Sequence, residues 1–238
     1  MPTVLTATTR RLAAALTPLL VGCASTRAAA PPPATAPTAT TAARPVADTS
    51  MAGMDMGGMP GMSGMDLPVK IPAGALFTEA DVRFMQGMIA HHGQAIHMSR
   101  LAASRGASPR MLRFTQKIDQ SQTAEIRLMQ EWLVANGQTA PDSGSWRRMM
   151  MPGMLTPEQL AALEAARGEQ FDEQFLRYMI QHHEGALRMV ADLFATPRAA
   201  QDVDVSVLAN DVQTTQTAEI ALMHQMLATL RDPSSGAR

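Results

Sequence analysis

The sequence predicts an all-α fold, an antiparallel four-helix bundle built from two duplicated helical hairpins. The first observation is a repeat, because residues 88–98 (MIAHHGQAIHM) return at 179–189 as MIQHHEGALRM. The second is a helical period of apolar residues from about residue 78 to 230, without a convincing run of the period-two alternation typical of strands. Two hairpins that each carry one apolar face bury those faces most simply against each other.

The repeat continues on both sides of the paired histidines. Phe84 and Phe175 precede the two copies, and Gln-Thr-Ala-Glu-Ile follows them at 122–126 and 216–220. The two histidine pairs are 91 positions apart, whereas the two Gln-Thr-Ala-Glu-Ile elements are 94 positions apart, so three residues are inserted in the second copy. Such a repeat indicates a duplicated supersecondary unit, and we expect the bundle to span 75–231.

Capping signals place the helices of the first hairpin. Thr78, with Asp81 three residues later, is expected to cap the first helix. Ser108 and Pro109 have the pattern of an N-cap followed by a first-turn proline, so they are expected to start the second helix. These two helices make up the predicted hairpin 78–137.

The second hairpin is predicted at 156–231. Thr156 and Pro157 open a third helical stretch, which is expected to break near Gly168 and to continue to about Ala195. A fourth helix is expected from about residue 203 to 230.

Residues 1–22 have the composition of a secretory signal peptide. Arg10 and Arg11 precede an apolar run that is too short to span a membrane. Cys23, the single cysteine, directly follows Leu-Val-Gly, and this arrangement resembles the lipobox of bacterial lipoproteins, whose cysteine is lipidated. The mature protein is then expected outside the cytoplasmic membrane, at the cell surface or in the periplasm, and anchored by acyl chains. An ordinary signal peptide with an incidental cysteine is the alternative.

Two segments of low complexity separate this signal from the bundle. Residues 23–50 are rich in Ala, Pro and Thr and are expected to form a tether. Residues 51–74 are expected to form a flexible, disordered arm, in which methionines alternate with glycine and other small residues. Thioethers select Cu(I) and need no deprotonation, so the arm is a candidate copper ligand; a plain linker or an oxidation sink is the alternative. Its candidate donors are Met51, Met54, Met56, Met59, Met62 and Met65.

The charge balance excludes one class of function. Twenty Lys and Arg residues oppose 21 Asp and Glu residues, for a formal net charge of −1, and the basic residues form no dense run. A nucleic-acid-binding surface is therefore not expected. With one cysteine, the chain also has no thiol pair for an internal disulfide.

The paired histidines are expected inside the bundle. At about 100° per residue, His91 and His92 fall on the core-facing side of their helix with Met88 and Met98, whereas His97 falls on the opposite side and is expected in solvent. The same pattern recurs in the second copy, and the partner helix of each hairpin adds a buried Gln and Glu. These residues are His182, His183, Met179 and Met189 in the second copy, and Gln122, Glu125, Gln216 and Glu219 on the partner helices.

Two explanations of this buried polar set remain open. In the first, Glu125 and Glu219 accept hydrogen bonds from the histidines in a structural network that Gln122 and Gln216 complete. In the second, the imidazoles bind a metal ion together with carboxylates or with the thioethers beside them. Copper, as Cu(I), is the favoured ion, and iron and zinc are the alternatives. Burying unpaired polar groups costs about 1–3 kcal/mol each, so one of the two explanations is needed.

The motif Phe-x-x-x-Met-Ile-x-His-His-x-x-Ala-x-x-Met, followed by Gln-x-x-Glu-Ile-x-x-Met, occurs twice. It resembles the bacterial domain-of-unknown-function family numbered 305, over about residues 75–231 and including the Met-Pro-Gly-Met-Leu-Thr-Pro-Glu junction at 151–158. The resemblance implies a ferritin-like fold and, for some members, an association with extracytoplasmic copper. Carried over by position, the four paired histidines are the family's signature residues and the four methionines beside them are their companions.

We expect a metal-binding protein rather than an enzyme. Di-iron bundles use Glu-x-x-His on two of their helices, and this sequence has no Glu-x-x-His. It also lacks a nucleophile elbow and a phosphate-binding loop. The favoured function is copper sequestration, copper tolerance or transfer to a copper-handling protein. The alternatives are a ferritin-like metalloenzyme with an unconventional His/Glu di-metal centre and a structural lipoprotein without metal.

Overall fold

A computed structural model describes residues 67–231. This part of the chain is all-α, and two short 3-10 helices, η1 (Ala102–Arg105) and η2 (Ser145–Arg147), accompany its α-helices. The signal peptide, Cys23, the tether and the methionines of the arm lie outside the described residues, so their predicted roles stay predictions. No helix within 67–231 is both long and apolar enough to span a membrane. The five α-helices are α1 (Glu79–Leu101), α2 (Pro109–Ala135), α3 (Pro157–Ala165), α4 (Gly168–Ala195) and α5 (Val203–Arg231).

The predicted caps of the first hairpin are confirmed. The Thr78 hydroxyl accepts a hydrogen bond from the Asp81 amide, and the Asp81 carboxylate accepts one from the Thr78 amide at 2.7 Å. The other oxygen of Asp81 accepts from the Ala200 amide at 2.6 Å, so the cap also fixes the loop between α4 and α5. Ser108 caps α2 through the Met111 amide, and Pro109 is its first residue.

The predicted break near Gly168 is confirmed, and it divides the third helical stretch into α3 and α4. Ala166 and Arg167 are extended there, and Gly168 has a positive φ of 54°. The Arg167 guanidinium donates to the carbonyl oxygens of residues 164–166, at 2.7 to 2.9 Å. These bonds satisfy carbonyl groups that the end of α3 leaves without a helical partner.

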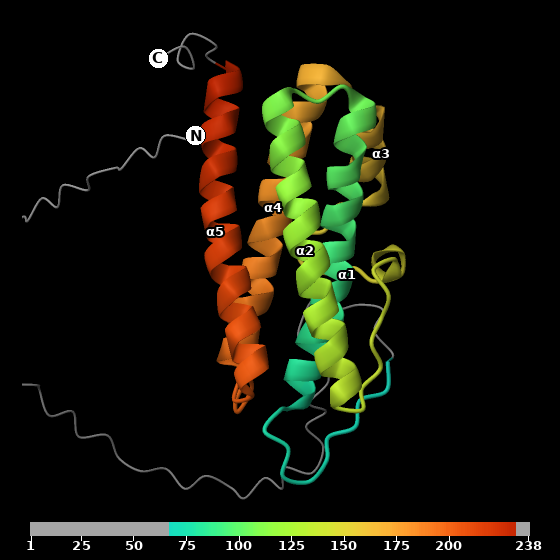
Figure 1. The fold of residues 1–238 in the computed structure, drawn as a ribbon, viewed down its shortest axis with the longest axis vertical. Coiled ribbons are helices and arrows are strands. Elements are labelled where there is room, and N and C mark those ends of the chain that lie inside the picture. Colours follow the sequence, from blue (N-terminus) through green and yellow to red (C-terminus); the bar gives the residue numbers. More distant parts are fainter. Residues whose placement is uncertain (1–66, 232–238) are drawn as a thin grey trace, which may run out of the picture. The chain divides into compact units, whose positions relative to one another are not determined.

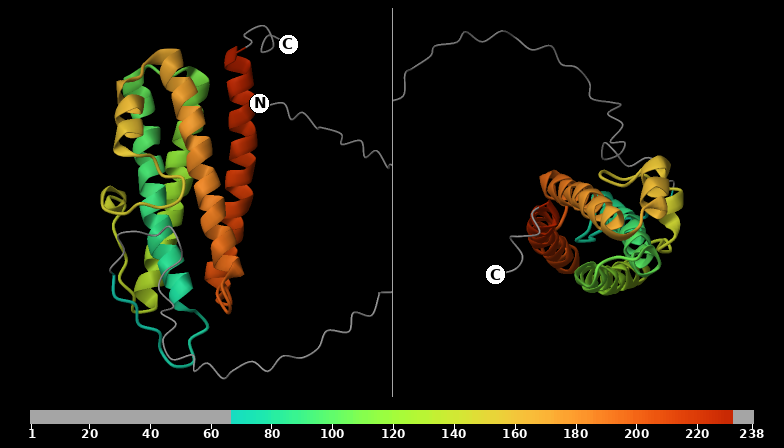
Figure 2. Two further views of the ribbon diagram at one scale, coloured as in Figure 1. Left: turned by 180° about the vertical axis from the view of Figure 1, so that it is seen from behind. Right: turned by 90° about the horizontal axis from the view of Figure 1, so that it is seen from above.

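The two copies of the repeat form two helical hairpins. α1 runs antiparallel to α2, and α4 runs antiparallel to α5 (Figure 1). The hairpins meet where α1 packs on α4. The connector, defined as residues 136–156, and α3 lie along the outer side of α1 (Figure 2).

A polar layer divides the interior into two apolar clusters. The first cluster contains the first half of α1 and the second half of α4, with Met88, Met129 and Met189. The second contains the end of α1 and the first half of α4, with Met98, Met179 and Met223. On each of the four long helices, buried polar residues fall in sequence between the main segments that supply the two clusters: the paired histidines on α1 and α4, Gln122 on α2, and Gln216 and Glu219 on α5. The duplication therefore places a polar layer at mid-height of the domain.

One predicted face of α1 is wrong. The helical period that places His97 on the solvent side also places Gln86, Ala90 and Gly93 there, but all three are buried. The connector covers this face, where Gln86 donates to the Thr139 carbonyl at 2.9 Å and Gly93 packs on the Ser143 carbonyl. His97 itself is partly covered, with 28% of its side chain exposed. A helical period therefore predicts the solvent-facing side of a helix only where no other segment of the chain packs on that side.

Candidate metal centre

The four paired histidines are fully buried in the polar layer. His91 on α1 and His182 on α4 lie against each other, with ring centroids 3.8 Å apart and planes inclined by 42°. The ring centroid of His92 lies 6.5 Å from that of His91, and the ring centroid of His183 lies 6.3 Å from that of His182. The close packing of α1 on α4 therefore brings both copies of the motif into one place.

Each hairpin closes a His–Glu pair across its own two helices. Nε2 of His92 lies 2.6 Å from a carboxylate oxygen of Glu125, and Nε2 of His183 lies 2.9 Å from one of Glu219. Lys117 approaches the other oxygen of Glu219 to 3.7 Å. The structure thus bears out the predicted imidazole–carboxylate pairing, although the partners are His92 and His183 rather than the central histidines.

The connector distinguishes the two central histidines. Nε2 of His91 donates to the carbonyl of Pro152 at 3.0 Å, since a carbonyl oxygen can only accept. Gln94 holds this part of the connector by bonding both the amide (2.7 Å) and the carbonyl (3.1 Å) of Leu155. His182 has no such partner, and both of its nitrogens are buried without a hydrogen bond.

The structural network is therefore incomplete. In native proteins most buried polar atoms have a partner, and each exception needs an explanation. The atoms of this layer without a hydrogen-bond partner are Nδ1 of His91, His92, His182 and His183, Nε2 of His182, Oε1 of Gln122 and of Glu219, and both amide atoms of Gln216. This concentration of unpartnered donors and acceptors is typical of a site that receives a ligand.

Burial favours the neutral form of three of these imidazoles, those of His91, His182 and His183. Burial, with the neighbouring His92, lowers the pKa of His91 to about 3, although its bond to Pro152 acts in the opposite direction. Burial also lowers the pKa of His182 well below its usual value; the nearby His91 carbonyl opposes this but makes no hydrogen bond of acceptable geometry. Burial lowers the pKa of His183 despite the opposing effect of Glu219. Neutral imidazoles keep the lone pair that a metal ion needs.

Thioethers border the layer on both sides. Met88 precedes His91 by three positions and Met179 precedes His182 by three, a spacing that makes helix side chains neighbours. The four predicted methionines are all buried, and each apolar cluster combines one from each copy. Met129 and Met223, which end the repeated Gln-x-x-Glu-Ile-x-x-Met motif, are the equivalent buried methionines of α2 and α5. Soft donors therefore lie above and below the imidazoles.

Nitrogen and oxygen donors alone do not form a complete metal site. Among residues 67–231, no three His, Cys, Asp or Glu side chains are grouped so that they could hold one ion. A metal site in this layer consequently needs donors of another kind, and the methionine thioethers are the candidates that the fold supplies.

The role of the connector was missing from the sequence analysis. Gly185 and Gly153 pack so closely that an added Cβ on Gly185 would collide with the carbonyl of Pro152. Gln94 in the first copy corresponds to Gly185 in the second. This difference between the copies was the available signal, because Gln94 bonds Leu155 of the connector whereas Gly185 lets Pro152 approach its backbone.

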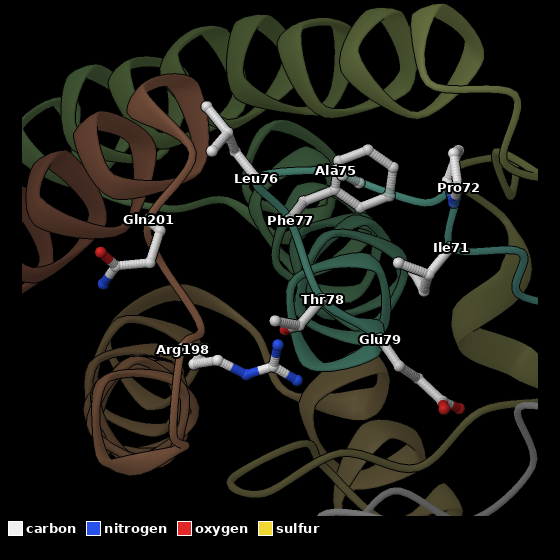
Figure 3. Close-up of a pocket in the computed structure, with 10 residues that line it drawn as sticks. Ile71, Pro72, Ala75, Leu76, Phe77, Thr78, Glu79, Arg198 and Gln201 are labelled. Carbon is white, nitrogen blue, oxygen red and sulfur yellow. The ribbon is translucent and has the colours of Figure 1, made fainter.

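A cavity of about 820 Å³ lies elsewhere, between residues 71–79 and the loop that joins α4 to α5. Apolar side chains such as Leu76 and Phe77 line it together with Arg198 and Gln201 (Figure 3). None of the predicted site residues contributes to it. Since α1 rises about 1.5 Å per residue, His91 lies about 18 Å along the helix from this cavity.

Comparison with known proteins gives a family and structures of three similar proteins. The model of the family described as "Domain of unknown function (DUF305)" matches residues 81–233. The structure of a "putative secreted protein DUF305 from Streptomyces coelicolor" is 28% identical, covers 63% of this chain and 93% of that chain, and has a TM-score of 0.57. A DUF305 fragment from Deinococcus radiodurans is 33% identical over 64% and 97% of the two chains, with a TM-score of 0.54.

The third similar structure contains a metal. CopM in its Cu(I)-bound form is 28% identical, covers 63% of this chain and 96% of that chain, and has a TM-score of 0.50. CopM has also been solved in a Cu(II)-bound form, which is 27% identical with a TM-score of 0.51. The comparison with curated proteins gave no match.

Proposed function

Because this chain belongs to the DUF305 family, whose relative CopM has been solved with bound copper, we propose that it is an extracytoplasmic copper-binding protein that prefers Cu(I). The "putative secreted" relative from Streptomyces coelicolor and the signal-like residues 1–22 support a location outside the cytoplasm. In this proposal the four long helices form a ferritin-like bundle that holds the ion, and Cys23 carries the lipid that anchors the chain to the membrane.

One observation supports the proposal most strongly. His182 is completely buried, lies against His91, and leaves both ring nitrogens without a hydrogen bond. Such burial costs about 1–3 kcal/mol when nothing compensates it. A bound ion would compensate it, because an ion takes the lone pair that the surrounding protein leaves unused.

The donor types favour copper over harder ions. Imidazole suits zinc, iron and copper alike, whereas thioethers are soft donors that favour Cu(I). Met88 and Met179 adjoin the central imidazoles, and no third His, Cys, Asp or Glu side chain in 67–231 completes an oxygen- and nitrogen-rich site. This combination favours Cu(I) over the di-metal enzyme that remains the alternative.

The arm at 51–65 supplies a second set of donors in the proposal. Its six thioethers exchange quickly and would capture Cu(I), while the bundle would hold an ion in a more ordered site. Capture followed by storage suits sequestration, tolerance or delivery to another copper-handling protein. We propose binding and not catalysis as the biochemical role.

Metal titration tests the proposal. The soluble chain from Ala24 onward would be titrated under reducing conditions with Cu(I), and separately with Zn(II) and Fe(II), beside a variant lacking residues 51–65. We expect tight Cu(I) binding by both chains, with lower stoichiometry after the deletion. Iron binding to the bundle without Cu(I) binding would refute the copper assignment and favour the di-metal alternative.

A further inference from the structure

We propose that the cavity between residues 71–79 and the loop joining α4 to α5 binds a small monocarboxylate that carries an apolar chain. In this arrangement Arg198 pairs with the carboxylate, and the apolar side chains of 71–77 cover the chain (Figure 3). The site goes beyond the proposed function and does not depend on it, because none of the candidate metal ligands lines the cavity.

The cavity has a fixed wall. Phe77, which is buried, packs edge-to-face on Trp132 of α2, with ring centroids 5.2 Å apart and planes inclined by 76°. The Trp132 indole donates to the Asp202 carboxylate at 3.1 Å, and the same oxygen accepts from the amides of residues 204 and 205 at the start of α5. Three segments of the chain thus meet at Phe77, so the cavity is formed before a ligand binds, as is usual for small-molecule sites.

The loop that carries Arg198 is fixed as well. Arg198 and Ala200 have positive φ angles of 65° and 54°, a conformation that residues other than glycine rarely adopt and that surrounding contacts must maintain. The Asp81 carboxylate accepts from the Ala200 amide at 2.6 Å, and Ala199 is buried in the first apolar cluster. The loop therefore presents Arg198 to the cavity in one backbone conformation.

The Arg198 guanidinium is the free charge of the cavity. Its side chain extends toward Thr78 (Figure 3), and it makes no hydrogen bond or ion pair with the residues that the structure describes. The other charged residue that lines the cavity, Glu79, is paired with Arg83 at 3.1 Å. Because a guanidinium can donate two parallel hydrogen bonds to a carboxylate, the cavity has an unused group that recognises this anion.

Apolar side chains line the other part of the cavity. Leu76 is 69% exposed and Ile71 is 43% exposed, and Pro72 and Ala75 also contribute to the lining. An apolar chain bound here would remove part of this surface from water, which favours binding roughly in proportion to the area covered. The volume of about 820 Å³ lies within the range of small-ligand sites.

Charge selects the class of ligand. The free guanidinium of Arg198 balances one negative charge, and the Glu79 carboxylate at the same cavity repels a second one. A monocarboxylate is therefore favoured over a phosphate monoester, which carries about −1.5 to −2 at pH 7. A phospholipid also combines a single negative charge with apolar chains, so the experiment must separate it from a free carboxylate.

Calorimetric titration of the soluble chain from Ala24 onward with octanoate tests the site. We expect saturable binding, with an affinity that changes by up to about fourfold for each methylene in the series hexanoate, octanoate and decanoate. Octan-1-ol and octylammonium, which lack the anion, should bind about tenfold more weakly or less. In ¹⁵N NMR spectra, octanoate should shift the amide signals of residues 71–79 and of the α4–α5 loop.

Two pairs of surface variants separate the contributions of charge and apolar contact. Arg198→Gln should weaken octanoate binding about tenfold, whereas Arg113→Gln, an exposed arginine outside the cavity, is the matched control and should not. Leu76→Ser should reduce the gain in affinity with chain length, and Leu128→Ser, 58% exposed on α2, should leave it unchanged. All four side chains are exposed, so the variants should fold, which circular dichroism checks.

Three results would overturn the assignment. The first is octylammonium binding as tight as octanoate binding, and the second is unchanged octanoate affinity in Arg198→Gln. The third is binding to phosphatidylglycerol vesicles that depends on Arg198 without any binding of octanoate, because the site would then recognise a lipid head group. Copper binding stands or falls separately, since the metal titration uses neither variant pair.

Discussion

Replacing His182 with leucine is expected to stabilise the metal-free protein while weakening its metal binding. His182 is buried with two unpartnered nitrogens, so its imidazole packs in the interior but adds no hydrogen bond to the stability of the fold. His183, the next residue, is buried to the same extent but bonds Glu219 at 2.9 Å. His183→Leu is therefore a matched control, in which the same substitution removes an imidazole that has one hydrogen-bonded nitrogen instead of none.

The expected magnitudes have opposite signs. An unsatisfied buried polar group costs about 1–3 kcal/mol, so His182→Leu should gain about that amount, less any cost of repacking against His91. Removing the His183 imidazole leaves a buried oxygen of Glu219 without its hydrogen-bond partner, which costs about 1–3 kcal/mol. His183→Leu should lose somewhat less than this, because Lys117 lies 3.7 Å from Glu219. For a domain of this size, each kcal/mol shifts the melting temperature by about 2–4 °C.

Thermal and urea unfolding of the two variants, with and without Cu(I), measure these effects. We expect the melting temperature of His182→Leu to exceed that of the parent chain when metal is absent, and the added stability from Cu(I) to be largely lost. If His182→Leu is as destabilising as His183→Leu, the imidazole of His182 stabilises the metal-free fold. That result would refute the claim that His182 is an unpartnered side chain available to bind a metal ion.

Three further predictions follow from the same layer. Burial lowers the pKa of His91 in the folded protein to about 3, so as pH falls below about 6.5 this histidine is protonated in the unfolded chain but not in the folded one. His91 alone should therefore lower the free energy of unfolding by about 2 kcal/mol between pH 7 and pH 5. Urea unfolding at the two pH values should show this loss, and the loss should be smaller in His91→Leu. Gly185→Ala should cost about 1–3 kcal/mol in urea unfolding, because the new Cβ collides with the Pro152 carbonyl, and an unchanged midpoint would contradict that contact. Replacing the six methionines at 51–65 with leucine should lower Cu(I) stoichiometry by titration yet leave the bundle's melting temperature unchanged; an unchanged stoichiometry would exclude the arm as a site.

The secondary structure was largely predictable because its signals are local. Thr78 and Asp81, Ser108 and Pro109, and Gly168 each act through their own backbone or the next few residues. The duplication then predicted which helices pair, since equivalent sequences form equivalent hairpins.

The site was predictable in composition but not in detail. Helical spacing placed the histidines, methionines and glutamates in the interior, and their burial is confirmed for all but the partly exposed Glu125. It could not reveal that Glu125 and Glu219 bond the second histidine of each pair, because both histidines of a pair face the core side. The contact between His91 and Pro152 was equally hidden, because the connector has no period and its carbonyl groups bear no sequence signal.

The copper environment is the most direct test of the account. X-ray absorption at the copper edge of the Cu(I)-loaded chain lacking residues 51–65 reports which atoms surround the ion in the bundle. The account predicts mixed nitrogen and sulfur scattering, with the nitrogen contribution falling in His182→Leu. Scattering from oxygen and nitrogen alone, or a spectrum unchanged by His182→Leu, would contradict a site built from the buried imidazoles and the thioethers beside them.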